Sequence, residues 1–363
     1  MADRHPGLLT AGIGSLVVGG GYAAVKWLAG SDRRRTGVDR QRLANAMEEL
    51  AEPIGTRHHV FAAHDAGQLH AVEFGPSDAP PIVLLHGVTI SAALFNHALA
   101  DLGPEFRVVA LDWRGHGRSR PGRDGYGLGV LARDLVTLLT HLDLTNAVVL
   151  GHSMGGMALG RFAVDHPATL RERVGGLVFC NTAAFDVGRA GPAVVRQFLT
   201  RIAEGRGEMI GKLAQAPSGD LAYVLARVAF GDDPDPVAVE QMRILYDAMS
   251  PSAITSSVLP LLTHDIRAGL PSVTTPSLVM VGSKDPLTPP SQAEALRNLL
   301  PHATLHTFPG SGHLPMLERR ADFTRVLASF ARSPGAYSSS PLATALANDG
   351  AGGRRGRRQA WKA

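Results

Sequence analysis

The sequence predicts an α/β fold with a mostly parallel sheet, helices on both faces and one helical insertion. Short apolar runs such as residues 81–85 and 147–151 are typical of strands buried on both faces. Amphipathic stretches such as residues 131–142 separate these runs, which is the alternation of a parallel sheet with crossover helices. Residues 185–270 show helical periodicity only, and we interpret them as an insertion between two strands.

The elements follow one another in a regular order. Residues 58–64 and 68–74 predict an antiparallel pair of strands at one edge of the sheet. We then expect strand 81–87, helix 91–102, strand 106–112, helix 131–142, strand 147–151, helix 154–166, strand 174–181 and, after the insertion, strand 277–282, helix 291–300, strand 303–308 and helix 317–332. An insertion at the carboxyl ends of parallel strands lies over the place where such sheets bind ligands, so we expect a lid.

This order divides the chain into five parts. Residues 58–184 and 271–332 form the predicted core, and residues 185–270 form the predicted helical cap. Residues 31–57 are polar and are interpreted as a linker. Residues 333–363 are rich in Ser, Gly and Ala and end in an arginine cluster, which predicts a disordered basic tail.

Residues 1–30 form a hydrophobic amino-terminal segment. Twenty consecutive uncharged residues run from Pro6 to Val25, which is about the length of a membrane span, although six of them are glycine. A membrane anchor, a cleaved secretory signal and a soluble arm all remain open. The basic residues follow the segment rather than precede it, which favours an anchor over a signal peptide and predicts a membrane-associated protein with its body on the cytoplasmic side. A soluble cytoplasmic protein is the alternative.

The same segment suggests self-association. Small residues recur every fourth position from Gly7 to Ala23, a spacing that lets two membrane helices approach closely. This ridge is a candidate contact between two copies of the chain.

Charge and cysteine content narrow the function. Residues 58–332 carry 23 Lys+Arg against 25 Asp+Glu, so the net positive charge of the chain lies at its two ends. This distribution argues against nucleic-acid binding and leaves a membrane lipid surface as a candidate partner. The single cysteine, Cys180, cannot form an intramolecular disulfide, and it lies in an apolar run where a small buried thiol is expected.

Ser153 is the candidate nucleophile. It lies in the stretch GHSMGG, directly after the apolar run 147–151 and at the start of a predicted helix. A strand, a sharp turn with glycines on either side, and a helix form the elbow that exposes a serine oxygen above a sheet. The alternative interpretation is a serine that merely caps an ordinary helix.

A base and an acid follow in the second half of the chain. His313 comes just after the strand 303–308, and Asp285 comes just after the strand 277–282. A serine hydroxyl needs such a base, oriented by a third group, and all three side chains are expected at the carboxyl ends of parallel strands. The backbone N–H groups of Met154 and Val88 are the candidate oxyanion donors.

The motifs HGVT, DWRGHGRS, GHSMGG, GSKDPLTP and GSGHLPMLE occur in this order, and with them residues 58–332 resemble the α/β-hydrolase superfamily. The resemblance implies an eight-stranded sheet, a helical cap and the triad of Ser153, Asp285 and His313. It also implies that Asp112 and His116 belong to a structural loop. The whole sequence resembles the esterase- and lipase-type hydrolases of actinobacteria.

These observations predict a serine hydrolase that cleaves carboxylic esters of hydrophobic substrates through a covalent acyl-enzyme. The expected partner is a small hydrophobic acyl substrate, and we expect no metal and no cofactor. A thioesterase, a carbon–carbon bond hydrolase and a perhydrolase would use the same apparatus. A ligand-binding receptor with little turnover is an alternative of another class.

Overall fold

The computed structural model describes residues 50–185, 226–247 and 251–339, together with Tyr223 and residues 41, 45, 46 and 48. The expected anchor and its small-residue ridge, most of the linker, residues 186–222 of the expected cap and the tail from residue 340 lie outside these residues. In the part of the chain that is described, no helix combines the length and the apolar character needed to cross a membrane.

Within the described residues, eight strands form one sheet in the order β1-β2-β4-β3-β5-β6-β7-β8. Strand β1 is antiparallel to β2, and β2 is antiparallel to β4, whereas all the other neighbours are parallel. The predicted fold, mostly parallel with an antiparallel edge, is therefore confirmed. The strands are β1 (Arg57–Ala62), β2 (Gln68–Phe74), β3 (Pro81–Leu85), β4 (Arg107–Asp112), β5 (Ala147–His152), β6 (Val174–Cys180), β7 (Ser277–Gly282) and β8 (Ala303–Phe308).

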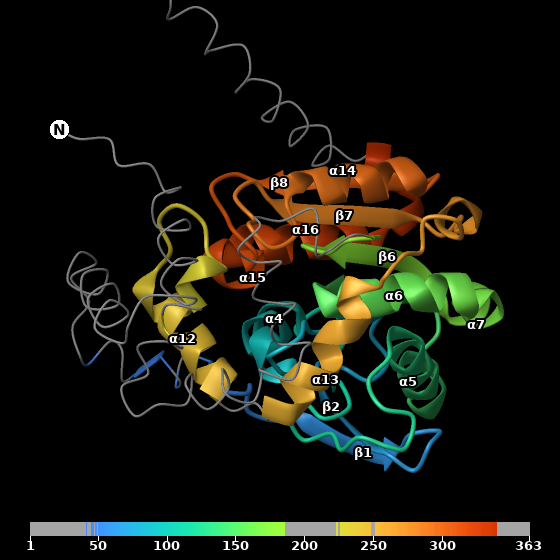
Figure 1. The fold of residues 1–363 in the computed structure, drawn as a ribbon, viewed down its shortest axis with the longest axis horizontal. Coiled ribbons are helices and arrows are strands. Elements are labelled where there is room, and N and C mark those ends of the chain that lie inside the picture. The colour runs from blue at the N-terminus through green and yellow to red at the C-terminus, as the bar shows by residue number, and fades with distance from the viewer. Residues whose placement is uncertain are drawn as a thin grey trace, which may run out of the picture.

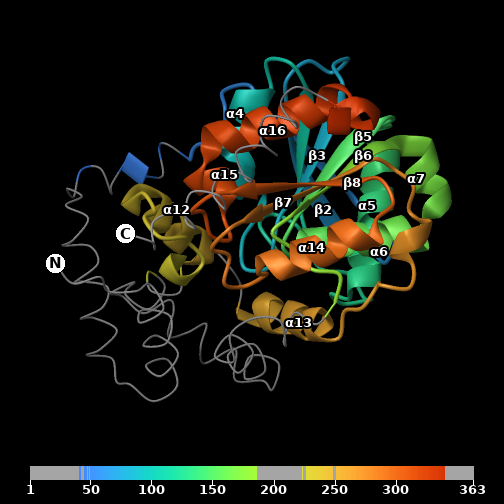
Figure 2. The same ribbon diagram turned by 90° about the horizontal axis from the view of Figure 1, so that it is seen from above.

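Each face of the sheet carries its own hydrophobic core, because successive side chains of a strand point to opposite faces. In β3, Ile82 and Leu84 join one core, and Val83 and Leu85 join the other. Helices α4 (Asn96–Leu102) and α16 (Arg320–Arg332) cover the first face, as Figure 2 shows. Helices α5 (Leu128–His141), α6 (Met154–Asp165) and α14 (Pro290–Leu299) cover the second.

Helices α12 (Pro236–Asp247) and α13 (Pro251–Leu262) lie between β6 and β7 in the chain (Figure 1). Val239 and Met242 of α12 pack into the core that contains α4, while Leu261 of α13 packs into the core that contains α6. Phe185, which follows β6, and Asp265, which precedes β7, form an isolated antiparallel bridge between the two ends of the insertion. The two described helices of the insertion are thus joined to opposite faces of the sheet.

Several short elements differ from the prediction. Helix α4 is preceded by a 3₁₀ turn, η1 (Ala92–Phe95), and two further short helices, α7 (Pro167–Arg173) and η3 (Leu270–Ser272), had not been expected. The helix expected over residues 317–332 is two helices, α15 (Pro315–Glu318) and α16, because Arg319 between them leaves the helical region with φ −136° and ψ 44°.

Both ends of the core extend further than the sequence indicated. A disordered tail was expected from Ser333, but the chain continues as the 3₁₀ helix η4 (Pro334–Ser339). There Tyr337 is buried and packs edge-on against Phe330 at a ring-centroid distance of 5.4 Å, which gives this segment an apolar anchor. In the expected linker, Leu50 is buried and its carbonyl accepts a hydrogen bond from Asn96 Nδ2 at 2.8 Å.

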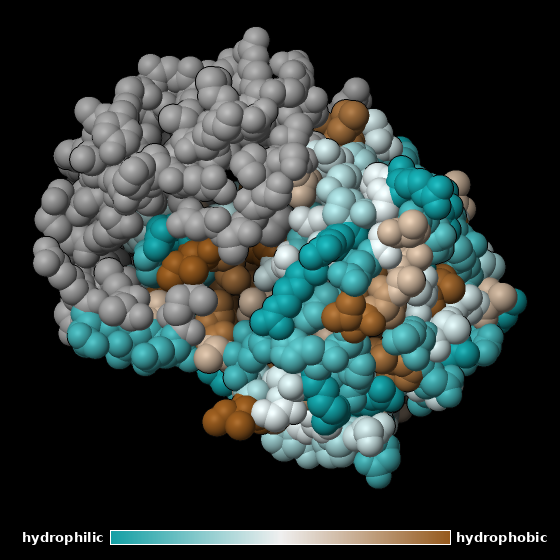
Figure 3. Space-filling model, turned by 90° about the horizontal axis from the view of Figure 1, so that it is seen from below, coloured by the Kyte–Doolittle hydropathy of each residue, from teal (hydrophilic) through white to brown (hydrophobic). Residues whose placement is uncertain are grey.

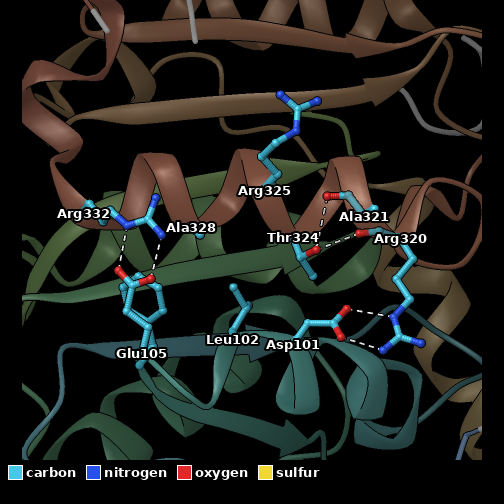
Figure 4. A pocket seen from close by; sticks show the side chains of 10 residues that line it. Asp101, Leu102, Glu105, Arg320, Ala321, Thr324, Arg325, Ala328 and Arg332 are labelled. Carbon is cyan, nitrogen blue, oxygen red and sulfur yellow. Dashed lines mark hydrogen bonds and ion pairs between the residues drawn. The ribbon is translucent and has the colours of Figure 1, made fainter. Parts of the chain in front are cut away.

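Among the described residues, an open groove of about 640 Å³ lies between α4 and α16. Two bidentate ion pairs are drawn in Figure 4: Arg320 of α16 pairs with Asp101 of α4, and Arg332 of α16 pairs with Glu105 in the turn that follows α4. Arg325 points away from both pairs. On another face of the molecule, drawn in Figure 3, hydrophobic and hydrophilic areas of the described residues are mixed.

Candidate active site

The candidate residues gather at the carboxyl edge of the parallel strands. Ser153 follows β5, Asp285 follows β7 and His313 follows β8. In the sheet, β3 has β4 on one side and β5 on the other, so the chain reverses its direction of winding between β3 and β5. Such a switch point opens a crevice beyond the strand ends, because the two following loops turn away from each other. Val88 and Ser153 flank that point.

Ser153 sits in a strained turn. Its φ of +53° and ψ of −119° are unusual for a residue with a Cβ atom. The Ser153 N–H donates to the Cys180 carbonyl at 3.0 Å, and the Ser153 carbonyl accepts from Thr182 Oγ1 at 2.6 Å. The turn is thus held by β6 on one side and continues directly into α6. The strand–turn–helix elbow expected from the sequence is present.

Two glycines make the elbow sterically feasible. A Cβ atom built on Gly155 would lie 2.3 Å from the Leu85 carbonyl oxygen, and one built on Gly151 would lie 2.4 Å from the Gly155 carbonyl oxygen. Real side chains do not approach backbone atoms so closely. Bare backbone at both positions lets α6 begin directly against the end of β3.

Asp285 and His313 form a buried pair. The His313 Nδ1–H donates to Asp285 Oδ2 at 2.8 Å, and both side chains are at most 7% exposed. This bond leaves Nε2 of His313 as the basic nitrogen of the neutral ring. Burial raises the pKa of Asp285, but the His313 charge and the hydrogen bonds donated to the carboxylate outweigh burial and hold the pKa below its usual value.

His313 is fixed next to the elbow by its backbone. The His152 Nε2–H donates to the His313 carbonyl at 2.9 Å, and the two rings lie 4.8 Å apart between centroids. Ser153 Oγ itself makes no hydrogen bond to His313 or to any other described residue. Contacts between a nucleophile and its base often tighten only when substrate binds. The structure therefore brings all three residues to one edge and joins two of them directly.

The expected oxyanion donors lie on either side of Ser153. A Cβ atom built on Gly87 would be 3.0 Å from Ser153 Cβ, so the loop after β3 passes directly beside the serine. Val88 follows in that loop, and Met154 is the first residue of α6. Neither N–H donates a hydrogen bond to another group of the described residues, and the first N–H groups of a helix have no partner within it.

Two residues that sequence reasoning missed hold the acid in place. Asn181 Nδ2 donates to Asp285 Oδ2 at 2.7 Å and to the Gly312 carbonyl at 3.0 Å, which links the acid loop to the histidine loop. Thr288 Oγ1 donates to the same carboxylate oxygen at 2.7 Å. Asn181 directly follows β6, so the rule that sites gather at strand ends could have found it.

The other polar groups near the strand ends have structural partners. His86 Nε2 accepts from the Trp113 backbone N–H at 3.0 Å, and Asp112 accepts from His70 Nδ1 at 2.8 Å. These contacts join the ends of β3 and β4 to their neighbours and agree with the structural role expected for the loop after β4.

One group within the described residues has the spacing of metal ligands: His64, Asp65 and Asp124. Arginines already occupy it. Asp65 accepts two hydrogen bonds from buried Arg114, and Asp124 accepts one from Arg133 at 2.8 Å. Because these cations neutralise the carboxylates, the group is poorly suited to a metal ion.

The close approach at Gly155 predicts a specific loss of stability. Gly155→Ala places a methyl group into backbone that cannot move without shifting β3 or α6, so we expect a loss of about 1–3 kcal/mol in urea unfolding. Gly129→Ala in α5 is the matched control, because a Cβ there meets nothing within 4 Å and the substitution should be neutral or stabilising by up to about 1 kcal/mol. Equal behaviour of the two variants would contradict the steric explanation.

Buried neutral histidines predict acid sensitivity. Burial lowers the pKa of both His86 and His152 to about 3, whereas in the unfolded chain each titrates near 6.5. As the pH falls from about 6.5 to about 3, the unfolded state gains protons that the folded state does not, so stability falls through this window. His152→Gln cannot titrate and should show a shallower fall between pH 7 and pH 4.5 in urea unfolding. An unchanged slope would show that His152 does not contribute.

Comparison with known proteins places this geometry in a family. The model of the α/β-hydrolase fold family matches residues 80–320. A protein provisionally named carbamate hydrolase RutD, from Caulobacter sp., is 31% identical over 68% of this chain and 89% of its own length. The 3-oxoadipate enol-lactonase 2 of Acinetobacter baylyi is 24% identical over 71% of this chain and 91% of its own length.

Two solved structures agree with this match. An esterase from Exiguobacterium antarcticum superposes with a TM-score of 0.65 at 25% identity, covering 76% of this chain and 99% of its own. The enol-lactonase of Burkholderia xenovorans gives a TM-score of 0.64 at 25% identity, with coverage of 76% and 100%. With its eight-stranded sheet, its elbow and a family match over most of its length, the chain belongs to the α/β-hydrolase family.

Proposed function

We propose that this hydrolase cleaves carboxylic esters with Ser153 as nucleophile, His313 as general base and Asp285 as the acid that orients the base. The observation that carries the proposal is the strained serine at the end of β5, on the same sheet edge as a His313–Asp285 pair at the ends of β8 and β7. Relatives named as esterases and enol-lactonases support an ester as the bond that is cleaved.

Each residue has a defined step. His313 Nε2 accepts the Ser153 proton as Oγ attacks the ester carbonyl, and the negative oxygen that forms is held by the Met154 and Val88 N–H groups. The proton then passes to the departing alcohol as the ester C–O bond breaks. A water molecule, deprotonated by the same nitrogen, then attacks the acyl carbonyl carbon. The bond to Ser153 Oγ breaks, the proton returns from His313 to Oγ, and the acid is released. Asp285 stays ionised throughout and stabilises the imidazolium, which fits its lowered pKa.

A hydrophobic acyl group is the substrate we propose. Val88, Leu287 and Phe185 are apolar, only partly buried, and lie in the loops that follow β3, β7 and β6. All three loops leave the sheet at the edge that carries Ser153. Apolar surface next to convergent polar groups is typical of small-molecule sites.

Replacement of the nucleophile tests the proposal. Ser153→Ala should lower hydrolysis of short p-nitrophenyl esters by about 10⁴-fold or more and should abolish labelling by a fluorophosphonate probe. Ser272→Ala is the control, because Ser272 is exposed and its hydroxyl only caps a turn at the Gly269 carbonyl. Labelling that survives in Ser153→Ala would rule out this nucleophile. A panel of esters, thioesters and carbamates with the wild type would then define the preferred bond.

We also propose that residues 6–25 attach the protein to the cytoplasmic face of a membrane. Support comes from the length of the uncharged run and from the arginines that follow it.

Deletion of the segment tests this attachment. A chain lacking residues 1–30 should move from the membrane fraction to the soluble fraction after centrifugation, because the apolar run is gone. A chain lacking residues 340–363 is the control and should stay with the membrane, since it loses basic residues but keeps the apolar run. If removal of residues 1–30 left the distribution unchanged, the anchor would be refuted.

A further inference from the structure

The insertion is hydrogen-bonded directly to the loop that carries His313. The His313 backbone N–H donates to the Ala229 carbonyl at 2.6 Å, and the Asp232 N–H donates to the Gly310 carbonyl at 3.2 Å. Residues 229–232 precede α12, and residues 310–313 follow β8. Two segments far apart in the chain therefore pair through their backbones at the candidate base. We call this contact the strap.

No side chain separates the two backbones of the strap. A Cβ atom built on Gly231 would lie 1.9 Å from the Gly310 carbonyl oxygen, and one built on Gly312 would lie 2.5 Å from the Ala229 carbonyl oxygen. The contact thus depends on glycine on both sides. A displacement of one segment must displace the other.

The carboxylate of Glu318 joins both sides of the strap. Its Oε2 accepts from the Gly231 N–H at 2.8 Å, and its Oε1 accepts from the Gly312 N–H at 2.9 Å. Oε1 also accepts from Ser311 Oγ at 3.1 Å, and from the Leu314 N–H at 3.3 Å. These donors surround His313 in the chain and include one from the insertion.

We propose that Glu318 is a positioning residue for His313, which fastens the histidine loop to the insertion and so holds the base at the angle that Ser153 requires. The inference rests on the proposed function of His313. Glu318 itself touches neither Ser153 nor Asp285 through any hydrogen bond between described residues, so its effect would pass through the backbone of the loop.

Only a carboxylate satisfies this set of donors. All the contacts approach from N–H or O–H groups, and hydrogen bonds to an ionised acceptor are about twice as strong as neutral ones. Glu318→Gln has nearly the same shape but replaces one acceptor oxygen by an NH₂ group, which would face an N–H of the strap. The histidine loop would then shift or loosen without loss of side-chain volume.

Labelling kinetics separate positioning from a general effect on folding. With saturating fluorophosphonate, the labelled fraction counts folded sites, whereas the second-order rate constant reports the alignment of Ser153 and His313. We expect Glu318→Gln to keep full stoichiometry, to lower the rate constant by about ten- to a hundredfold, and to lower kcat on p-nitrophenyl esters with little change in KM. Glu105→Gln, which breaks a surface ion pair between Arg332 of α16 and the turn that follows α4 (Figure 4), is the matched control and should behave as wild type.

Three outcomes would overturn the inference. A wild-type rate constant in Glu318→Gln would show that the loop does not need the carboxylate. A lower stoichiometry at an unchanged rate constant would show a role in folding only. If the wild-type protein is not labelled at all, the proposed nucleophile is wrong and the inference fails with it. This outcome differs from the first two, in which the wild-type protein is labelled.

Hydrogen exchange and a second variant examine the strap without turnover. In Glu318→Gln, peptides that cover residues 226–232 and 310–318 should exchange faster together, while peptides of β5 should not change. Gly231→Ala, which pushes the two backbones apart and leaves Glu318 intact, should lower the labelling rate constant in the same way. Slow exchange of both segments in Glu318→Gln would contradict the link between them.

Discussion

The bare contact between the first turn of α6 and the end of β3 is the constraint on which the site depends. Gly155 sits so close to the Leu85 carbonyl that no side chain can separate the two elements. This contact sets where the elbow stands above the sheet, and it brings Gly87 against Ser153. One packing contact, between α6 and β3, therefore positions both the serine and the loop that carries Val88. A looser fit would leave the two sides of the proposed oxyanion site independent of each other.

The order of strands explains how distant segments meet. Strands β5, β6, β7 and β8 are consecutive neighbours, so the serine, Asn181, the acid and the histidine stand side by side along one edge. Asn181 bridges the gap between the acid loop and the histidine loop with two hydrogen bonds from a single amide. The buried carboxylate of Asp285 is stabilised by donors from three separate loops, and this explains how it stays ionised although burial raises its pKa. The order of the strands thus supplies the hydrogen bonds that stabilise the charge of Asp285.

The sheet, its antiparallel edge and the positions of Ser153, Asp285 and His313 at strand ends could be predicted because buried strands have a strong local signal. The break at Arg319 and the folded turn around Tyr337 could not, since each depends on a partner that only the tertiary structure supplies. The same holds for Glu318, whose bond to Gly231 spans 87 positions in the chain. No local sequence pattern around Glu318, five residues after His313, indicates which groups it will bind. Asn181 is an intermediate case. The sequence shows that it follows β6, but it does not show which groups accept hydrogen bonds from its amide.

The backbone pairing between residues 229–232 and the histidine loop bears on how such an enzyme can be altered by recombination. Judged from the sequence alone, an insertion between β6 and β7 could be exchanged as a unit. Here the insertion is bonded to the histidine loop in both directions. The Ala229 carbonyl accepts from the His313 N–H, and the Gly231 N–H donates to the Glu318 carboxylate. A chimera that exchanges the insertion alone would separate residues that fit one another, so the unit of exchange is the insertion together with the loop and short helix that end at Glu318. The hydrogen bonds between the insertion and the histidine loop, and not the ends of the inserted sequence, thus define which residues must be exchanged together.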